Sequence, residues 1–178
     1  GCRNLDLDIV IEGSAIDFGK VLAKDLGGTL VVHRKFGTCA VFMKDRMKID
    51  LATARKEVYE KPAALPTVEF SSLKNDLVRR DFTINAMAIS LNKENFGQLI
   101  DFFNGDEDLA HGRIRALHDK SFIDDPTRIF RAVRFEQRLG FAIEKHTEEL
   151  ILGAVEKEMI EKVEPQRVRD EIILILQE

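Results

Sequence analysis

The first third of the chain alternates apolar and polar positions with the periods expected of a sheet and one helix. Residues 5–11 (LDLDIVI) alternate and are rich in β-branched side chains, which predicts a strand that ends at Gly13. Ser14, with Asp17 three residues later, forms a capping box and opens a predicted helix that runs to about Leu26. Three short strands are then expected in TLVVHRKF, CAVFMK and RMKIDLATA. This order of elements predicts an α+β domain with a mixed or antiparallel sheet and flanking helices.

The pattern changes in the middle of the chain and becomes helical towards its end. Residues 55–76 contain Pro62 and Pro66 and show no clear period, so they are expected to form a long loop. From Arg79 onwards a helix is expected, followed by brief strands in GQLIDFF and GRIRAL. Three further helices are predicted over about residues 125–139, 145–160 and 165–177. The sequence therefore predicts two domains, a sheet domain over residues 1–117 and an all-helical domain over residues 118–178.

Composition narrows the class of protein. Because 44% of the residues are hydrophobic and 33% are charged, the chain can bury a core and is expected to be globular. It shows no apolar run long enough to cross a bilayer and no signal-peptide pattern, which predicts a cytoplasmic protein without a membrane partner. The cysteines and histidines lack the spacing of zinc ligands. The net charge of −4 argues against indiscriminate nucleic-acid binding, yet six arginines lie within residues 113–138.

Three aspartates on predicted strands are candidate metal ligands. Asp6 and Asp8 are two residues apart, so both side chains leave the same face of their strand. Paired carboxylates repel each other unless a cation lies between them, and Mg²⁺ prefers oxygen ligands that it shares with substrate phosphates. A D-x-D pattern alone is most often a polar strand face, but Asp50, between Ile49 and Leu51 on another strand, could reach the same metals. Three such carboxylates are the usual support of two-metal phosphoryl transfer.

The segment DDPTRIFRAVRF suggests a base-reading pair. Pro126 suits a first helical turn, which places Asp125 near the N-cap and Arg128 across one turn from it. A carboxylate only accepts hydrogen bonds and a guanidinium only donates them, so the two complement an exocyclic amine beside an unprotonated ring nitrogen, as in cytosine and adenine. Arg131 and Arg134 continue the positive charge along the helix. Such a stripe is also common on solvated surface helices.

VRRDFTINAMAIS, residues 78–90, leaves two interpretations open. Arg79, Arg80 and Asp81 could be the solvated first turn of an ordinary helix, or polar groups directed at a phosphate and a sugar.

Five segments together resemble a known family. In order and approximate spacing they are similar to class II tRNA nucleotidyltransferases and their poly(A) polymerase relatives, which belong to the DNA polymerase β-like nucleotidyltransferase superfamily. The segments are LDLDIVIEG, RRDFTINAMA, DFFNGDEDLAHGRIR, DDPTRIFRAVRF and EPQRVRDEI. The resemblance implies a head domain over residues 1–117 that lacks its N-terminal part, an incomplete helical neck over residues 118–178, and further domains missing at both ends.

The resemblance also implies roles for particular residues. The residues implied to be catalytic and to hold two Mg²⁺ ions are Asp6, Asp8 and Asp50. The residues implied to bind the nucleotide are Arg80, Asp81, Asn85, Asp125, Arg128, Arg131 and Arg134. Within that set Asp125 and Arg128 would act as an amino-acid template for C and A, while Arg167 and Glu171 match the family's neck motif.

The activity that the resemblance implies is metal-dependent transfer of CMP, AMP or both from CTP and ATP to the 3′ end of tRNA, with release of pyrophosphate. One alternative is a poly(A) polymerase that acts on general RNA 3′ ends, although ALHDKSFI in place of that branch's usual element favours the tRNA branch. The other alternative is a catalytically idle module that binds nucleotide or RNA, a role that does not need three carboxylates.

Overall fold

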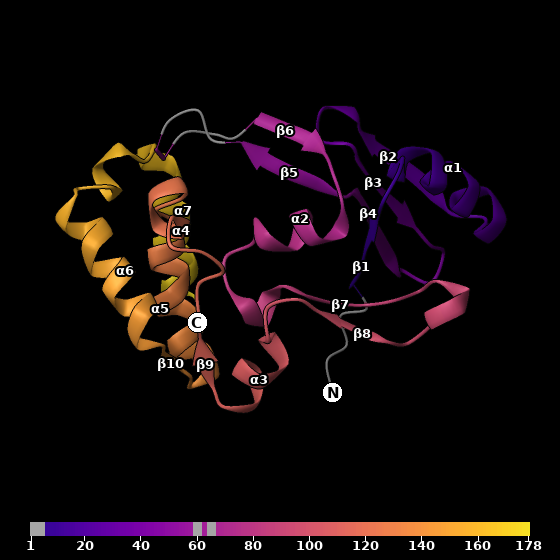
Figure 1. The fold of residues 1–178 in the computed structure, drawn as a ribbon. Helices are drawn as coiled ribbons and strands as arrows, with labels where there is room; N and C mark the ends of the chain where they lie inside the picture. Colours follow the sequence, from indigo (N-terminus) through magenta and orange to yellow (C-terminus); the bar gives the residue numbers. More distant parts are fainter. Residues whose placement is uncertain (1–5, 59–61, 64–66) are drawn as a thin grey trace. The chain divides into compact units, whose positions relative to one another are not determined.

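A four-stranded mixed sheet and a group of helices form two separate units of the chain, and this confirms the predicted α+β class (Figure 1). The computed structural model describes residues 6–58, 62–63 and 67–178. The first unit comprises residues 1–57 and 68–76, and the second comprises residues 58–67 and 77–178. The domain boundary that the sequence places near residue 117 stays a prediction.

The sheet of the first unit has the strand order β1-β4-β3-β2. Its strands are β1 (Asp6–Ile11), β2 (Thr29–His33), β3 (Thr38–Phe42) and β4 (Lys48–Thr53). β1 pairs with β4 in parallel, whereas β3 is antiparallel to both of its neighbours. The strand expected in TLVVHRKF ends at His33, and a 3₁₀ turn, η1 (Arg34–Phe36), follows it.

Helix α1 (Ala15–Leu26) covers one face of this sheet. The predicted cap is confirmed, because the Ser14 hydroxyl accepts a hydrogen bond from the Asp17 N–H at 3.2 Å. The core beneath the helix includes Ile49 and Leu51, which alternate with outward-facing residues of β4. Gly19 allows this close packing, since a Cβ there would lie 2.5 Å from the Cys39 sulfur. One face of the sheet is therefore apolar and covered, while the other faces away from α1.

The prediction of a long loop over residues 55–76 is wrong. This segment contains a two-stranded sheet and a short helix: β5 (Arg55–Val58), β6 (Thr67–Phe70) and α2 (Leu73–Val78). Lys56 Nζ and Glu69 Oε2 form an ion pair at 2.8 Å, and the Asp76 carboxylate accepts the Arg55 N–H. These contacts join residues far apart in sequence, so no local pattern of apolar and polar residues predicts them. Pro66 lies outside the described residues.

The prediction of a helix from Arg79 onwards is also wrong. The segment forms a 3₁₀ turn and a hairpin: η2 (Thr83–Asn85), β7 (Met87–Ile89), η3 (Lys93–Asn95) and β8 (Leu99–Asp101). β7 and β8 pair antiparallel. Alanine and methionine are among the better helix formers, but intrinsic propensity is a small contribution, and pairing with a second strand overrides it here.

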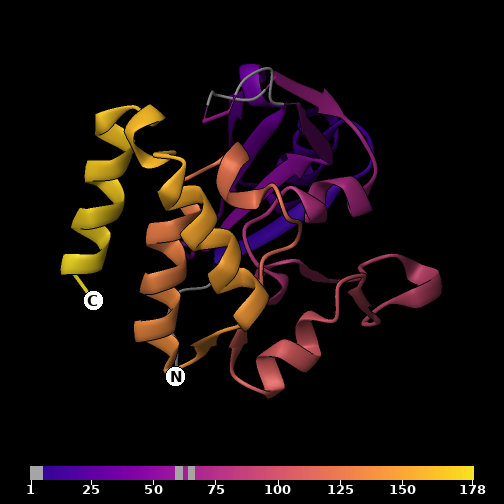
Figure 2. The same cartoon turned by 60° about the vertical axis from the view of Figure 1, so that its left-hand side comes forward.

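The second unit is mainly helical, as predicted, and Figure 2 shows its last helices in orange to yellow. Its remaining elements are α3 (Gly105–Ala110), β9 (Arg113–Ile114), α4 (Ser121–Asp124), α5 (Arg128–Leu139), β10 (Ala142–Ile143), α6 (Lys145–Glu156), η4 (Ile160–Lys162) and α7 (Pro165–Leu176). Phe82, Phe122 and Ile114 form the centre of its core. The helix predicted from residue 125 begins at Arg128, and the one predicted to reach residue 160 ends at Glu156. Among the described residues, no helix is long and apolar enough to cross a membrane.

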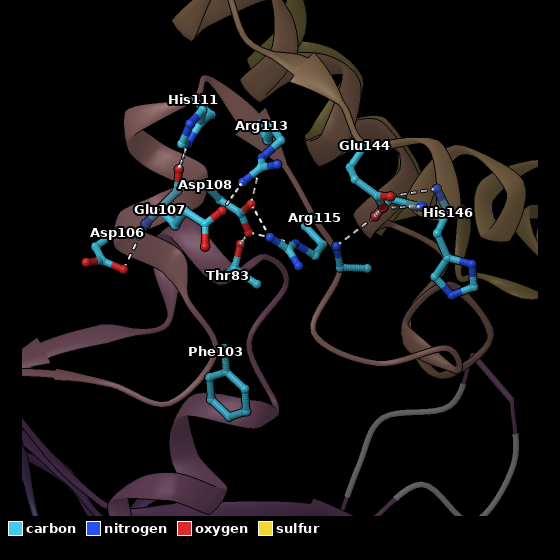
Figure 3. Close-up of polar contacts among 12 residues, drawn as sticks. Thr83, Phe103, Asp106, Glu107, Asp108, His111, Arg113, Arg115, Glu144 and His146 are labelled. Carbon is cyan, nitrogen blue, oxygen red and sulfur yellow. Dashed lines mark hydrogen bonds and ion pairs between the residues drawn. The ribbon is translucent and has the colours of Figure 1, made fainter.

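A buried carboxylate ties α3 to β9 and to the start of η2 (Figure 3). Asp108 is fully buried; it forms ion pairs with Arg113 and Arg115 and accepts a hydrogen bond from the Thr83 hydroxyl at 2.7 Å. Burial alone would raise the pKa of Asp108, but Arg115, Thr83 and Arg113 outweigh it and lower that pKa. Asp108 therefore contributes stability that is present above the ordinary aspartate pKa near 3.9 and is lost as the pH falls through the lowered value.

We expect Asp108→Asn to lower the free energy of unfolding by about 2–3 kcal/mol at pH 7, because it leaves two arginines without their shared carboxylate. The loss stays below that of a fully buried pair because both arginines reach solvent. Urea unfolding measures it, and the difference from the wild type should shrink below about pH 4. Glu107→Gln is the matched control, since Glu107 pairs with Arg113 at the surface, and it should change the value by less than about 1 kcal/mol. Equal losses in the two variants would contradict this role of Asp108.

Candidate active site

The backbone register of the first unit brings two of the predicted carboxylates together. In the parallel β1–β4 pair, Asp8 lies directly opposite Asp50. Neighbouring strands are about 4.8 Å apart, and residues in register point to the same face. Because Ile49 and Leu51 point into the core under α1, Asp8 and Asp50 occupy the opposite face. Asp8 is exposed and Asp50 is partly exposed, so both carboxylates face solvent rather than the core.

The third predicted aspartate, Asp6, belongs to the same strand as Asp8. Asp6 is two residues before Asp8 and pairs in register with Lys48 of β4. Its side chain lies outside what the structure describes. Among the side chains that are described, which do not include Asp6, no group of three or more His, Cys, Asp or Glu residues could hold a metal ion. The structure thus provides a pair of opposed carboxylates, and the role of Asp6 as the third ligand stays a prediction.

Sequence reasoning missed a lysine on this face. Lys48 Nζ lies 2.5 Å from Asp50 Oδ2, and both side chains are partly exposed. The signal was present as a K-x-D pattern, which places the two side chains on one face of β4 in the same way as D-x-D does on β1.

In the second unit, the segment that contains Arg80, Asp81 and Asn85 is closed by its own hydrogen bonds. The Asn85 side-chain amide donates to Asp81 Oδ1 at 3.0 Å, and the Phe82 N–H donates to the same oxygen at 2.8 Å. Arg80 Nη1 donates to the Asn85 carbonyl at 3.2 Å. The first turn of an ordinary helix is therefore excluded, since these groups are fixed in a compact turn that leads into η2 and includes its last residue, Asn85.

Arg131 and Arg134 take part in an ion-pair network rather than in a solvated stripe. Arg131 donates through Nε and Nη2 to Asp81 Oδ2, at 2.9 and 2.6 Å. Glu171 of α7 lies 3.6 Å from Arg131 Nη1 and 3.7 Å from Arg134 Nη2. Burial alone would lower the pKa of Arg131, but Asp81 and Glu171 outweigh it and raise that pKa. The network connects the turn at Asp81, α5 and α7.

The side chains of Asp125 and Arg128 bind different neighbours, although the Arg128 N–H donates to the Asp125 carbonyl at 3.1 Å. The prediction that Asp125 lies near the N-cap is confirmed, because its carboxylate accepts the Thr127 N–H at 3.2 Å just before α5, whereas Thr127 itself makes no side-chain cap hydrogen bond. The Asp125 carboxylate accepts from Thr127 and from Arg167 Nη2, which lies 2.9 Å from each carboxylate oxygen. The buried Arg128 donates instead to the Ser121 hydroxyl at 2.8 Å and to the Arg79 carbonyl at 2.5 Å. Each member of the pair is thus fixed separately by neighbours of its own.

The partners of Asp125 leave its two oxygens unequal. Oδ1 accepts from the N–H and hydroxyl of Thr127 and from Arg167, whereas the one described donor to Oδ2 is Arg167. Since a carboxylate oxygen has two lone pairs, Oδ2 retains the capacity to accept one more donor. An exocyclic amine is such a donor. Arg167 and Glu171 were found in the sequence only as part of a motif, and their contacts with Asp125 and Arg131 join residues about 40 positions apart.

The chain matches a known family over most of its length. Residues 1–115 match the family model described as poly A polymerase head domain. The A-adding tRNA nucleotidyltransferase of Geobacter sulfurreducens is 51% identical over the whole chain, which covers 20% of that protein. The A-adding tRNA nucleotidyltransferase of Halalkalibacterium halodurans is 45% identical over 97% of the chain, which covers 41% of that protein. The chain thus spans between a fifth and about two fifths of these relatives.

Solved structures agree with the sequence match. A CCA-adding enzyme in an apo form is 52% identical and superposes with a TM-score of 0.95 over 99% of this chain and 42% of its own. A tRNA nucleotidyltransferase in complex with a primer tRNA and an incoming ATP analogue is 45% identical, with a TM-score of 0.89 over all of this chain and 49% of its own.

The bond between Asp125 and Arg167 can be measured independently of any activity. In a double-mutant cycle of Asp125→Asn and Arg167→Met, we expect a coupling of about 1–2 kcal/mol in the free energy of unfolding, because charge-assisted hydrogen bonds are lost and both side chains are partly exposed. Arg169→Met, on an exposed position of the same helix, is the control and should show no coupling with Asp125. A coupling for Arg167 no larger than that for Arg169 would refute the bond.

Proposed function

Because the chain belongs to the poly A polymerase head domain family, we propose that it is the nucleotidyltransferase part of a protein that adds AMP to the 3′ end of tRNA. The observation that carries the proposal is the register of β1 and β4, which sets Asp8 opposite Asp50 on the face of the sheet away from α1. The choice of AMP rests on the two curated relatives above, both of which are A-adding enzymes.

The proposed reaction is a displacement at phosphorus. The terminal 3′-hydroxyl oxygen of the tRNA attacks the α-phosphorus of ATP and forms a new P–O bond. The bond from that phosphorus to the bridging oxygen of the β-phosphate breaks, and pyrophosphate leaves with the electron pair. The proton of the hydroxyl passes to solvent water as the attack proceeds.

The donor set of the carboxylate face fits divalent metal. Asp8 and Asp50 present hard oxygen atoms in register, and such oxygens are the ligands that Mg²⁺ prefers. We assign the holding of Mg²⁺ to these two residues together with Asp6. Bound in a two-metal site, Mg²⁺ would lower the pKa of the attacking hydroxyl and neutralise charge on the triphosphate. The protein's own part is to hold these carboxylates at a fixed separation through the strand pairing.

The nucleotide-binding roles are assigned to the second unit. Asp125, through Oδ2, would accept the exocyclic amine of the base, and Arg128 would donate to the neighbouring ring nitrogen. Arg131 and Arg134 carry guanidinium forks, which suit phosphate oxygens better than a lysine would. Arg80, Asp81 and Asn85 form the compact turn that would contact phosphate and ribose. These groups are already oriented by their neighbours, so that binding does not have to order them.

Asp50→Asn in the intact protein should reduce AMP incorporation by roughly 100-fold or more, because it removes a negatively charged metal ligand from the reacting phosphate. Labelled ATP, CTP and UTP are offered with tRNAs that end before CCA, after C or after CC, and with unrelated RNA. Asp25→Asn, on an exposed position of α1, is the control and should leave incorporation unchanged.

The same assay separates the alternatives. AMP added only to tRNA that ends in CC supports the proposal, whereas CMP addition to shorter ends would make the protein a CC- or CCA-adding enzyme. Extended A tracts on unrelated RNA would make it a poly(A) polymerase. Nucleotide binding without any incorporation would identify an idle binding module.

Asp125→Ala should weaken selection of ATP over UTP by about tenfold or more, because the acceptor for the exocyclic amine is lost while the phosphate contacts remain. Arg128→Lys should act in the same direction, since a lysine cannot reach Ser121 and the Arg79 carbonyl with a rigid fork. Incorporation ratios at limiting nucleotide give the measurement, and Arg138→Ala, at an exposed position of α5, is the control. If both variants reject UTP as strongly as the wild type does, the template role is wrong.

A further inference from the structure

The carboxylate face carries a positive charge of its own. Lys48 lies on β4 two residues before Asp50. In the β1–β4 pair it is opposite Asp6, just as Asp50 is opposite Asp8. Its ammonium group lies 2.5 Å from Asp50 Oδ2. With 39% of the Lys48 side chain and 34% of the Asp50 side chain exposed, neither group is buried, and the ammonium can leave the carboxylate for water without a large desolvation cost.

The neighbouring carboxylates of Asp8 and Asp50 repel each other, and a positive charge nearby would stabilise them. The backbone pairing of β1 with β4 keeps Asp8 and Asp50 neighbours on one face of the sheet, whether or not a cation is present. Two carboxylates that share one small region repel each other, and an ammonium within a few ångströms offsets that repulsion. Lysine suits this position because its charge sits on a flexible four-carbon stem, whereas an arginine fork would hold both carboxylate oxygens.

We propose that Lys48 is a built-in counter-ion of the carboxylate face, which pairs with Asp50 in the metal-free protein and gives way when a divalent cation takes those oxygens. The inference rests on the proposed metal-binding role of Asp8 and Asp50. Ammonium and metal compete for the same lone pairs of Asp50 Oδ2, so Lys48 stabilises the metal-free sheet and weakens metal binding at the same time. Lys48 thereby sets the metal concentration at which the site fills.

The first test is metal binding without nucleotide. Mn²⁺ replaces Mg²⁺ as the probe, and its binding to the intact protein is followed by electron paramagnetic resonance. We expect Lys48→Met to bind Mn²⁺ about 2- to 10-fold more tightly than the wild type, a range set by the strength of partly exposed ion pairs. Lys48→Arg keeps the charge and should show no tightening. Lys56→Met is the matched control, because Lys56 is also a strand lysine paired with a carboxylate, at 2.8 Å, and should bind Mn²⁺ like the wild type.

The second test is thermal unfolding, which needs no activity. In EDTA at low salt, Lys48→Met should lower the melting temperature by about 1–4 °C, since the carboxylate repulsion is no longer offset. Saturating Mn²⁺ should raise the melting temperature of this variant by more than that of the wild type, as the linkage between binding and stability requires. Lys56→Met should show the same Mn²⁺-induced rise as the wild type.

The outcomes distinguish the role of Lys48 from the metal site itself. Unchanged or weaker Mn²⁺ binding by Lys48→Met overturns the counter-ion role, and weaker ATP binding in the same variant would make Lys48 a phosphate ligand instead. If Asp50→Asn binds Mn²⁺ as well as the wild type does, or if neither protein binds it, the proposed metal site is wrong. In that case the melting temperatures in EDTA still decide whether Lys48 offsets the charge of the carboxylates.

Discussion

The parallel pairing of β1 with β4 is the constraint on which the chemistry of the first unit depends. It holds Asp8 and Asp50 opposite each other although their charges repel. The favourable free energy comes from the other face of the same strands, where Ile49 and Leu51 are buried under α1. Because side chains alternate along a strand, the apolar face and the charged face cannot be changed independently. The position of the carboxylates is thus a by-product of burying the apolar residues.

The second unit handles charge in the opposite way. Two of its arginines are already paired with carboxylates, Arg131 with Asp81 and Glu171, and Arg134 with Glu171. Buried charges need such partners, because an unpaired one would be expensive to remove from water. The pairing also fixes the direction in which each guanidinium points. An incoming anion therefore meets donors whose side-chain entropy is already lost, but it must replace a carboxylate that these arginines already bind.

The sequence predicted what depends on local patterns and missed what depends on distant contacts. The strands at Asp8 and Asp50, the Ser14 cap and the last helix follow from period, capping and Pro165 at the first helical turn. The strands β5, β6 and β7 were not predicted because their stability comes from pairing with distant residues, which overrides helix propensity and the presence of proline. By contrast, β8 lies within GQLIDFF, where a strand was predicted. The acceptor and donor chemistry of Asp125 and Arg128 identified them in the sequence, and the resemblance to a family agreed, but only the folded chain shows that Arg167 binds Asp125.

The register of β1 against β4 also acts as a check on folding. Because side chains alternate with a period of two, a slip of one residue would turn Asp50 towards α1 and expose Leu51 in its place. The misaligned sheet would bury a carboxylate in an apolar layer and lose part of its core, so it would be strongly disfavoured. The alignment that is needed to bring the carboxylates together is the same one that hydrophobic burial selects. A chain that reaches a stable sheet has therefore also assembled its carboxylate pair, without a separate step to correct it.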